Sequence, residues 1–374
     1  MRIGLNLLHA FPEIGGSWNY IASLVSALGE WDETNTYCAY VTALSEHLVP
    51  VRPNFACVRV NIRPSVRRQR ILYENTALQF AARRHRLGCM HWFANTQALM
   101  NSVPGAVTVY DLHPFLGFVR FSPAKRLYLR AMMRLTSSRA RVLLPMSQAT
   151  AEGLQHILHV DPERIVVIPP IVGSQFRPEA GETVAGFRTK YGLPDRFWLY
   201  VAHMYPHKNH VRLLEAYHRL RSSGVAPWPL VLRGEPAGAK AEIEAAIERL
   251  GLESDVITLP RLSQEELPAL YSAATAVVFP SLHEGGGIPV LEAMACGCPV
   301  VASSISAVRE FAGDAATYFD PLDVDGIAEA MKALQEDGTE RERNRQAGLA
   351  RAEGFRGHKI VGKLLSAYGR ALSR

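Results

Sequence analysis

The chain has 374 residues, of which 48% are hydrophobic and 20% charged, and its formal net charge is +6. This length exceeds one typical hydrophobic core, so we expect a globular protein of two domains. The mild basic excess suits an anionic substrate, an anionic membrane surface or nucleic acid, and does not choose among them. Five cysteines without a CxxC pair argue against a zinc knuckle and indicate reduced thiols.

The first residues, MRIGLNLLHAF, lack the charge, long apolar core and cleavage site of a signal peptide and predict a buried strand. No apolar run reaches the roughly 18–20 residues that span a bilayer. We therefore expect a cytoplasmic protein.

The first half predicts strands at 2–8, within 36–62, and at 107–110 and 142–145. A loop at 13–17 follows the first strand and precedes a helix at 18–28, so Gly15 and Gly16 are candidates for a phosphate contact through backbone N–H groups. Glycine pairs are also common at strand ends that bind nothing. Asp111 and His113 follow the strand at 107–110 and are candidates for acid/base chemistry or for contact with a sugar.

Two basic helices are expected at 71–86 and 123–141. The second interleaves arginines and Lys125 with apolar residues such as Leu127 and Tyr128. Such a mixture either lies on an anionic membrane surface or is a solvated face backed by core residues. No RNA- or DNA-binding motif accompanies it, so we expect no nucleic-acid partner.

The segment 169–196 is rich in proline and glycine and predicts a linker, after which the strand–helix rhythm restarts. Further strands are expected at 197–202, 229–232, 256–259, 276–279 and near 300, with helices between them and a final helix at 357–372. Regular alternation of strands and helices predicts a doubly wound parallel sheet in each half of the chain.

The most informative stretch is 283–303, HEGGGIPVLEAMACGCPVVAS. Glycines after Glu284 allow a ligand to approach the backbone, and Ile288-Pro289 opens a helix whose positive end points at that ligand. The same helix contains Glu292. The alternative is a glycine-rich connector with two solvated glutamates.

Three segments of the second half together resemble family 4 of the retaining, nucleotide-sugar-dependent glycosyltransferases. They are FWLYVAHMYPHKNHVRLL at 197–214, LSQEELPALY at 262–271 and PSLHEGGGIPVLEAMA at 280–295. The resemblance implies the α/β GT-B fold, in which two Rossmann-like domains with doubly wound parallel sheets face an interdomain cleft. The implied domains are an acceptor-binding domain at 1–175, a donor-binding domain at 176–355, and a helix at 356–374 that packs back on the first.

The resemblance also implies roles for single residues. Lys208 would neutralise the diphosphate of the donor, and ionised Glu292 would accept hydrogen bonds from the ribose hydroxyls. Glu284 would face the donor sugar, and with Lys208, Asp111 and His113 it completes the candidate catalytic set. The implied donor contacts also include Gly285, Gly286, Gly287, Ile288 and Pro289 of the loop, and Arg233, Arg261 and Leu262 at strand ends.

The chain departs from the family pattern at three positions. His207 stands where the family has a second basic residue, and a histidine is charged only part of the time near neutral pH. Gly286 stands where phenylalanine is usual, which leaves donor selectivity open. Tyr110 stands where the family often has a histidine that touches the donor sugar, so this role passes to Tyr110 or to His113.

The implied reaction moves a hexose, with mannose or a related deoxy-hexose favoured, from a nucleotide sugar to a glycan or polyprenyl-diphosphate-linked acceptor in surface polysaccharide synthesis, including O-antigen and lipopolysaccharide. GDP-mannose is the favoured donor, and UDP- and dTDP-sugars remain alternatives. We expect no metal or other cofactor, because no DxD-type metal motif stands where one would be needed and no acid or cysteine completes a zinc set with the histidines at 203–210. Membrane contact would occur at the cytoplasmic face, through the basic helices.

Two rival functions remain. One is a sugar- or nucleotide-binding module that has lost catalysis, which the three departures favour and the retained Lys208, Glu284 and Glu292 oppose. The other is different sugar-nucleotide chemistry on the same fold, such as epimerisation.

Overall fold

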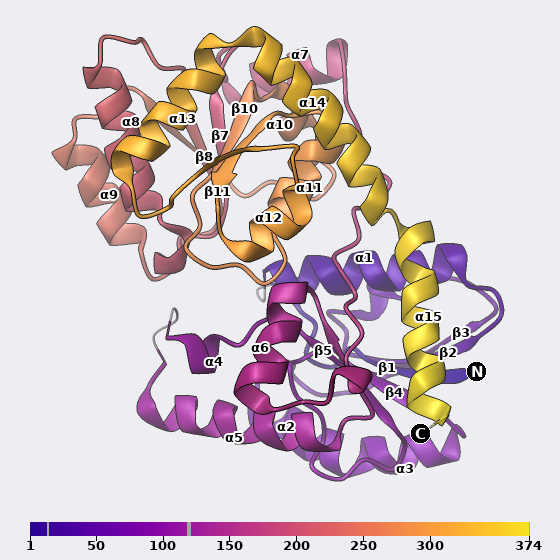
Figure 1. Ribbon diagram of the computed structural model, residues 1–374. Coiled ribbons are helices and arrows are strands. Elements are labelled where there is room, and N and C mark those ends of the chain that lie inside the picture. The colour runs from indigo at the N-terminus through magenta and orange to yellow at the C-terminus, as the bar shows by residue number, and fades with distance from the viewer. Residues whose placement is uncertain (13–14, 118–120, 374) are drawn as a thin grey trace. The chain divides into compact units, whose positions relative to one another are not determined.

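The computed structural model describes residues 1–12, 15–117 and 121–373. The chain forms two compact α/β units (Figure 1). Unit 1 consists of Met1–Gly173 with Arg356–Arg374, and unit 2 of Ser174–Phe355. Of the loop predicted at 13–17, positions 13 and 14 lie outside the described residues.

Unit 1 is built on a six-stranded parallel sheet in the order β3-β2-β1-β4-β5-β6. Its strands are β1 (Arg2–Asn6), β2 (Thr36–Val41), β3 (Phe55–Arg59), β4 (Cys89–Trp92), β5 (Gly105–Val109) and β6 (Val142–Pro145). Its helices are α1 (Gly16–Trp31), α2 (Arg67–Asn75), α3 (Ala77–Arg84), α4 (His113–Leu116), α5 (Pro123–Arg139), α6 (Gln148–Leu158) and α15 (Gly357–Ser373), with short 3-10 turns η2 (Glu46–Leu48) and η3 (Pro162–Arg164). Strands β4, β5 and β6 are buried along their whole length, and β5 and β6 are largely apolar in sequence, as expected for a parallel sheet covered on both faces.

Unit 2 repeats this plan in the order β12-β11-β10-β7-β8-β9, also parallel throughout. Its strands are β7 (Trp198–Val201), β8 (Leu230–Arg233), β9 (Val256–Leu259), β10 (Ala276–Phe279), β11 (Val300–Ser303) and β12 (Thr317–Phe319). Its helices are α7 (Glu182–Tyr191), α8 (His210–Ser222), α9 (Lys240–Arg249), α10 (Leu267–Ala273), α11 (Ile288–Ala295), α12 (Ser306–Ala312), α13 (Val324–Glu336) and α14 (Gly338–Ala352), with 3-10 turns η4 (Pro206–Lys208) and η5 (Glu353–Phe355). The predicted pair of doubly wound parallel sheets is therefore confirmed.

Two local predictions for unit 1 were wrong. The helix expected at 71–86 is two helices, because the backbone leaves the helical conformation at Thr76. Strand β4 was not predicted, since its sequence CMHW contains a histidine in place of a hydrophobic residue. His91 is buried between the Tyr368 hydroxyl at 2.7 Å and the Thr108 hydroxyl at 2.8 Å, which satisfies both ring nitrogens.

The last helix of the chain belongs to unit 1, where α15 packs against α1 and against β4, β5 and β6 (Figure 1). Its buried stripe includes Ile360, Leu364 and Tyr368. Arg356, just before α15, donates a hydrogen bond to the carbonyl of Gly173 at 2.9 Å. A segment distant in sequence therefore completes the core of unit 1.

Candidate functional site

In both sheets the order in which consecutive strands are added reverses between the first and fourth strands. These are β1 and β4 in unit 1 and β7 and β10 in unit 2. Ligands of open α/β sheets bind beyond the carboxyl ends of the strands at this switch point. In unit 2 the two loops that leave it are 202–209 and 280–287, which contain the predicted site residues His207, Lys208, Glu284 and Gly285 to Gly287.

Lys208 and Glu284 form an ion pair at this switch point. The Nζ of Lys208 lies 2.6 Å from Oε1 of Glu284, and the two side chains are only 16% and 10% exposed. Burial by itself raises the pKa of Glu284, but the charge of Lys208 and hydrogen bonds from Lys208 and Ser281 outweigh it and hold the pKa below its ordinary value. A buried carboxylate and a buried ammonium therefore stand charged beside each other.

The loop that carries Lys208 is held by neighbouring side chains. The Tyr200 hydroxyl donates to the carbonyl of Lys208 at 2.6 Å. Asn209 adopts a left-handed backbone with φ of 63°, and its Nδ2 donates to the carbonyls of Pro280 and Pro321 at 3.0 and 2.8 Å. These bonds tie together three loops at the edge of the sheet, so the position of Lys208 is determined by the scaffold.

The glycine loop ends in a backbone turn that suits its sequence. Gly287 has φ of 47° and immediately precedes α11, whose first turn contains Pro289. The N-cap residue is a glycine, so it offers this helix end no capping side chain, and Gly286 and Gly287 are buried. The positive end of α11 and the glycine backbone therefore lie on the same side as Lys208 and Glu284.

Glu292 differs from its predicted state. Its side chain is 5% exposed, and Oε2 accepts a hydrogen bond from the Tyr271 hydroxyl at 2.9 Å. Burial raises its pKa to about 7, although the Tyr271 hydrogen bond and the charge of Arg233 act in the opposite direction. We expected a carboxylate that is ionised at neutral pH; the structure instead holds a group that is close to half protonated there.

The other predicted basic residues, Arg233, Arg261 and His207, differ in burial and in their partners. Arg233 donates from Nη2 to the carbonyl of Leu262 at 3.0 Å, and its buried Nε has no hydrogen-bond partner among the described residues. Arg261 is exposed, with Nε 3.8 Å from Oε1 of Glu235. His207 is half-buried and stacks on Tyr205 with ring centroids 5.7 Å apart. Arg233 is thus the cation associated with Glu292, whereas Arg261 lies on the surface.

Sequence reasoning missed His203 and Tyr271. His203 follows β7 directly, and its Nδ1 accepts the backbone N–H of Glu235 at 3.1 Å. Burial lowers its pKa, with Arg233 as the next cause. Its place after a strand end was a usable signal, whereas no local pattern indicates that Tyr271 reaches Glu292.

In unit 1, Asp111 and His113 follow β5. Oδ1 of Asp111 accepts the backbone N–H of His113 at 2.9 Å, and Oδ2 lies 3.8 Å from the Nε2 of His113. Tyr110 packs its ring against Tyr20 in the core, and its buried hydroxyl has no hydrogen-bond partner in the described parts of the chain. His113, which is partly exposed, is therefore the better placed of the two substitutes for the family histidine.

Gly15 and Gly16 lie at the start of α1. Gly15 has φ of 65° and ψ of −127°, a conformation open to glycine, and among the described residues no side-chain hydrogen bond from this N-cap position caps the helix. A Cβ built at Gly16 would meet no described atom within 4 Å.

Comparison with known proteins identifies the family. The family described as glycosyl transferases group 1 matches residues 187–351, a range that includes Lys208, Glu284 and Glu292. The O-antigen chain mannosyltransferase B of Escherichia coli is 31% identical over 266 residues, which are 70% of each chain. This protein belongs to the group 1 glycosyltransferases.

Two further similarities agree with that assignment. The serotype-specific mannosyltransferase WbdA of Escherichia coli is 33% identical over 239 residues, which are 62% of this chain and 29% of that longer protein. The crystal structure of HepE from Anabaena in complex with UDP-glucose superposes with a TM-score of 0.77 at 17% identity, and the match covers 100% of both chains. The group 1 enzyme described here therefore has the GT-B architecture, and its chemistry is glycosyl transfer.

None of the helices in the described residues is long and apolar enough to cross a membrane. Within the same ranges, no group of three or more histidine, cysteine or acidic side chains is placed to hold a metal ion. The expectation of metal-independent transfer stays a prediction.

Proposed function

We propose that this glycosyltransferase transfers mannose from GDP-mannose, with retention of configuration, to a glycan acceptor in the synthesis of an O-antigen or a related surface polysaccharide. The observation that carries the proposal is the buried Lys208–Glu284 pair at the switch point of unit 2. The names of the two relatives supply the sugar and the class of product.

The pair would change partners when the donor binds. The diphosphate is a stronger local negative charge than one carboxylate, so it would attract the Lys208 ammonium, while Glu284 would accept hydrogen bonds from the sugar hydroxyls. The amides of Gly285 to Ile288, with Pro289 at the first turn of α11, would face the phosphates. His207 and Arg233 would add positive charge to the same region, and Arg261 would act only at longer range.

Glu292 would bind the ribose. Two vicinal hydroxyls can both donate to an ionised carboxylate, whereas a protonated one offers fewer acceptor sites. Because the pKa of Glu292 is about 7, this contact is expected to strengthen as the pH rises through neutrality. The Tyr271 hydroxyl would orient the carboxylate.

The chemical step would need no nucleophilic side chain. The bond from the anomeric carbon to the diphosphate oxygen breaks, and the acceptor oxygen bonds to the same face of that carbon. The acceptor proton passes to the leaving diphosphate oxygen. Lys208 would stabilise the charge that develops there, and Asp111 and His113 would contact the sugar.

A membrane surface would present the acceptor. Leu72, Phe80 and Leu127 are exposed on α2, α3 and α5, and the guanidinium of Arg67 lies 4.5 Å from the ring centroid of Tyr128, which joins α2 to α5. Apolar side chains among arginines suit an anionic lipid surface. This surface, defined by Arg67, Leu72, Phe80, Leu127 and Tyr128, is the proposed membrane face, and the acceptor would be linked to a polyprenyl diphosphate in the cytoplasmic leaflet.

A thermal-shift panel of GDP, UDP, dTDP and ADP tests the donor class. We expect GDP to give the largest rise in the unfolding temperature, because a ligand that binds only the folded state stabilises it. The UDP-glucose complex of HepE makes UDP the main alternative. The absence of a shift with all four nucleotides would contradict the proposal.

Release of nucleoside diphosphate tests whether transfer occurs. Rapid release from GDP-mannose is expected only when an acceptor glycan is also present. Nucleotide binding without such release would favour the alternative of a catalytically degenerate binding module, and a new sugar nucleotide as the product would favour an epimerase.

A further inference from the structure

A polar cavity lies at the amino end of β5 in unit 1, whereas Asp111 and His113 follow the carboxyl end of that strand. The cavity measures about 410 Å³, a size that can hold a small organic ligand. We name it the β5 cavity. It is lined by the loop from β4 to β5 and by the end of α5, through Gln97, Ala98, Leu99, Met100, Asn101 and Arg139.

The first residue of β5 leaves room for two of these side chains. A Cβ built at Gly105 would clash with Oε1 of Gln97 and would lie 3.2 Å from Nδ2 of Asn101. Both carboxamides therefore lie against the start of the strand, where a residue with a side chain would displace them. No residue of the β5 cavity belongs to the candidate catalytic set or to the predicted donor contacts.

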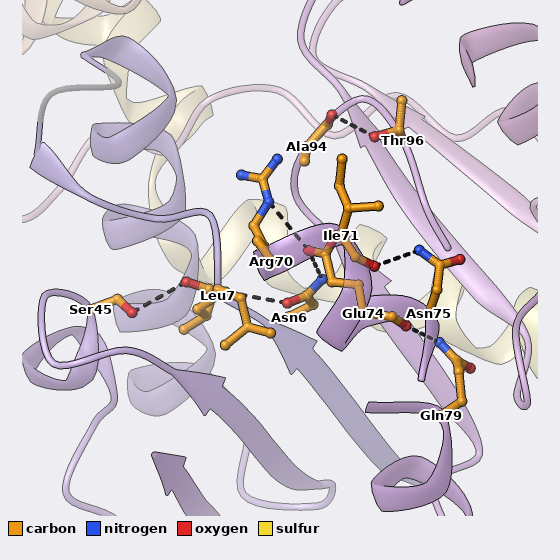
Figure 2. A network of polar contacts seen from close by, with 11 residues as sticks. Asn6, Leu7, Ser45, Arg70, Ile71, Glu74, Asn75, Gln79, Ala94 and Thr96 are labelled. Carbon is orange, nitrogen blue, oxygen red and sulfur yellow. Dashed lines mark hydrogen bonds and ion pairs between the residues drawn. The ribbon is translucent and has the colours of Figure 1, made fainter. Parts of the chain in front are cut away.

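Side chains at the ends of α2 and α3 hold the loop that forms one wall of the cavity. Asn75 and Gln79 each donate from the side-chain amide to a backbone carbonyl of α2, at 2.8 and 2.7 Å (Figure 2). Their side-chain oxygens accept the backbone N–H groups of Leu99 and Ser102, both at 2.7 Å. The position of the loop is therefore determined by these helices.

Two carboxamides of the cavity have unused hydrogen-bonding capacity. Gln97 is 6% exposed, and its Oε1 is buried without a partner among the described residues. Oδ1 of Asn101 is likewise buried and unpartnered within the described ranges. A buried carbonyl oxygen without a partner costs about 1–3 kcal/mol. Because no hydrogen bond of the described chain fixes either oxygen, each amide can turn its oxygen or its nitrogen to a ligand.

Arg139 supplies the positive charge of the cavity. Its Nη1 donates to the carbonyl of Leu99, which fixes the guanidinium against the loop. In the part of the chain that the structure describes, no carboxylate forms an ion pair with Arg139, so its charge is not neutralised. Nε and Nη2 remain as two parallel donors, the arrangement that binds two oxygens of one phosphate.

Exposed apolar side chains border this charge. Leu99 and Met100 line the cavity and are 44% and 78% exposed. Phe80, which follows the loop-holding Gln79 on α3, is 74% exposed and belongs to the proposed membrane face. An unneutralised cation beside apolar side chains suits an anion that also has a carbon chain.

The combination matches a polyol phosphate ester. The guanidinium would bind the phosphate, and the amides of Gln97 and Asn101 would pair with hydroxyl groups. Leu99 and Met100 would cover the carbon atoms of the ligand. One unpaired arginine balances the single charge of a phosphodiester, whereas a nucleoside diphosphate brings more negative charge than this cavity neutralises.

We propose that the β5 cavity binds a polyol phosphate, either as the glycerophosphate headgroup of an anionic lipid or as a free glycerol phosphate. The site goes beyond the proposed transfer reaction, and only its lipid source rests on the proposed membrane face. A bound headgroup would hold unit 1 on the lipid surface at a defined point. The competing explanation is that Arg139 only fastens the loop to α5 through the Leu99 carbonyl.

The test uses the full chain and isothermal titration calorimetry with three probes. They are glycerol phosphate, dihexanoyl-phosphatidylglycerol below its micelle concentration, and inorganic phosphate. Gln97→Met keeps the length of the side chain and removes the amide, and Arg139→Met removes the guanidinium. The matched control is Arg141→Met, which removes an exposed arginine two positions further along the chain that does not line the cavity.

We expect glycerol phosphate or the lipid to bind, and binding to weaken at least about tenfold in both cavity variants but not in Arg141→Met. Tighter binding of the lipid identifies the headgroup as the ligand, and tighter binding of glycerol phosphate identifies the free ester. The inference is overturned if neither ester binds, if the cavity variants bind normally, if Arg141→Met loses as much affinity, or if inorganic phosphate binds as tightly as both esters. If Arg139→Met does not fold, Gln97→Met decides alone.

A thermal shift with GDP, measured on the same samples, separates this inference from the proposed function. The shift should persist in the cavity variants, since the proposed donor residues of the switch-point loops lie in unit 2. A wild-type protein that responds to nucleotide and to neither ester contradicts the β5 cavity site only. A protein that binds an ester and responds to no nucleotide contradicts the transferase proposal and leaves the cavity site supported.

Discussion

At the scale of single residues, the chemistry of the proposed donor site depends on two glutamates in different environments. Glu284 is held ionised by Lys208, whereas Glu292 is buried beside Tyr271 and has a pKa of about 7. The same residue type therefore has two protonation behaviours eight positions apart. We therefore make separate predictions for Glu284 and Glu292.

For the ion pair, we expect Lys208→Met to lower the free energy of unfolding by about 3–5 kcal/mol, because it leaves Glu284 buried without its partner. The double variant Lys208→Met/Glu284→Gln should recover most of that loss, yet it should still bind nucleoside diphosphate poorly. Chemical denaturation and thermal shift with nucleotide measure the two effects. Full recovery of nucleotide binding in the double variant would contradict the role of Lys208.

For Glu292, the raised pKa makes stability depend on pH. The protonated carboxyl is favoured in the folded state, so its stabilising contribution is present below the ordinary pKa of 4.5 and is lost as the pH rises through about 7. A shift of this size corresponds to about 3 kcal/mol. We expect Glu292→Gln to remove this part of the pH dependence between pH 5 and 8, measured by denaturant unfolding. Equal pH profiles for both proteins would argue against the buried, half-protonated state.

The ribose contact of Glu292 predicts the opposite trend for binding. Affinity for guanosine, which has no phosphate to titrate, should rise from pH 6 to 8 in the wild-type protein. In Glu292→Gln it should be weak and independent of pH. Isothermal titration calorimetry at several pH values measures this affinity. A wild-type affinity that does not change with pH would contradict the assignment of Glu292 to the ribose.

At the scale of elements, a residue with a left-handed backbone conformation precedes each of the two helices of the proposed donor site. Asn209 precedes α8 and Gly287 precedes α11, with φ of 63° and 47°. Each allows the chain to turn sharply from a loop into a helix at the edge of the sheet. Asparagine and glycine are the residues that adopt this conformation at least cost.

Gly287→Ala tests this turn. The left-handed conformation should cost about 1–2 kcal/mol in a residue with a side chain, and the new Cβ would lie 3.4 Å from Cδ2 of Phe311. The control is Gly362→Ala, on the exposed face of α15, where nothing lies within 4 Å and the helix should gain up to about 1 kcal/mol. Unfolding midpoints of the two variants should therefore move in opposite directions; a Gly287→Ala midpoint at or above the wild-type value would contradict the strain argument.

At the scale of the whole molecule, two units with the same strand order place different chemistry at equivalent switch points. Unit 2 presents the ion pair of Lys208 and Glu284, and unit 1 presents Glu74 with Asn6 and Arg70 beside it. In each unit a histidine follows the first strand, His9 in unit 1 and His203 in unit 2. One fold plan therefore places different polar side chains at the same position of the sheet in the two units.

The proposed membrane face belongs to unit 1 and predicts selective association with lipid. Phe80 and Leu127 are 74% and 70% exposed. We expect the protein to sediment with vesicles that contain anionic phospholipid and not with purely zwitterionic ones, and the association to weaken with salt. Phe80→Ser/Leu127→Ser should reduce it several-fold, whereas Val51→Ser, at an exposed apolar residue outside this surface, should not. Equal sedimentation of all three proteins would contradict the proposed face.

The sequence by itself determined the fold class, most of the strands and the identity of the loop with Glu284 and Gly287. These follow from local causes: apolar runs make buried strands, and glycine or proline at a strand end makes a tight turn into a helix. The motif resemblance to glycosyltransferases also depends on short contiguous segments. Helix boundaries such as the break at Thr76 were missed, because intrinsic propensity there does not distinguish one helix from two.

Only the tertiary structure decided which side chains meet and which are charged. Lys208 and Glu284 are 76 residues apart, Asn6 and Glu74 are 68 apart, and His91 and Tyr368 are 277 apart. The raised pKa of Glu292 likewise depends on burial under elements distant in the chain. Contact and desolvation are properties of the packed core, whereas local periodicity records only which way each residue faces within its own helix or strand.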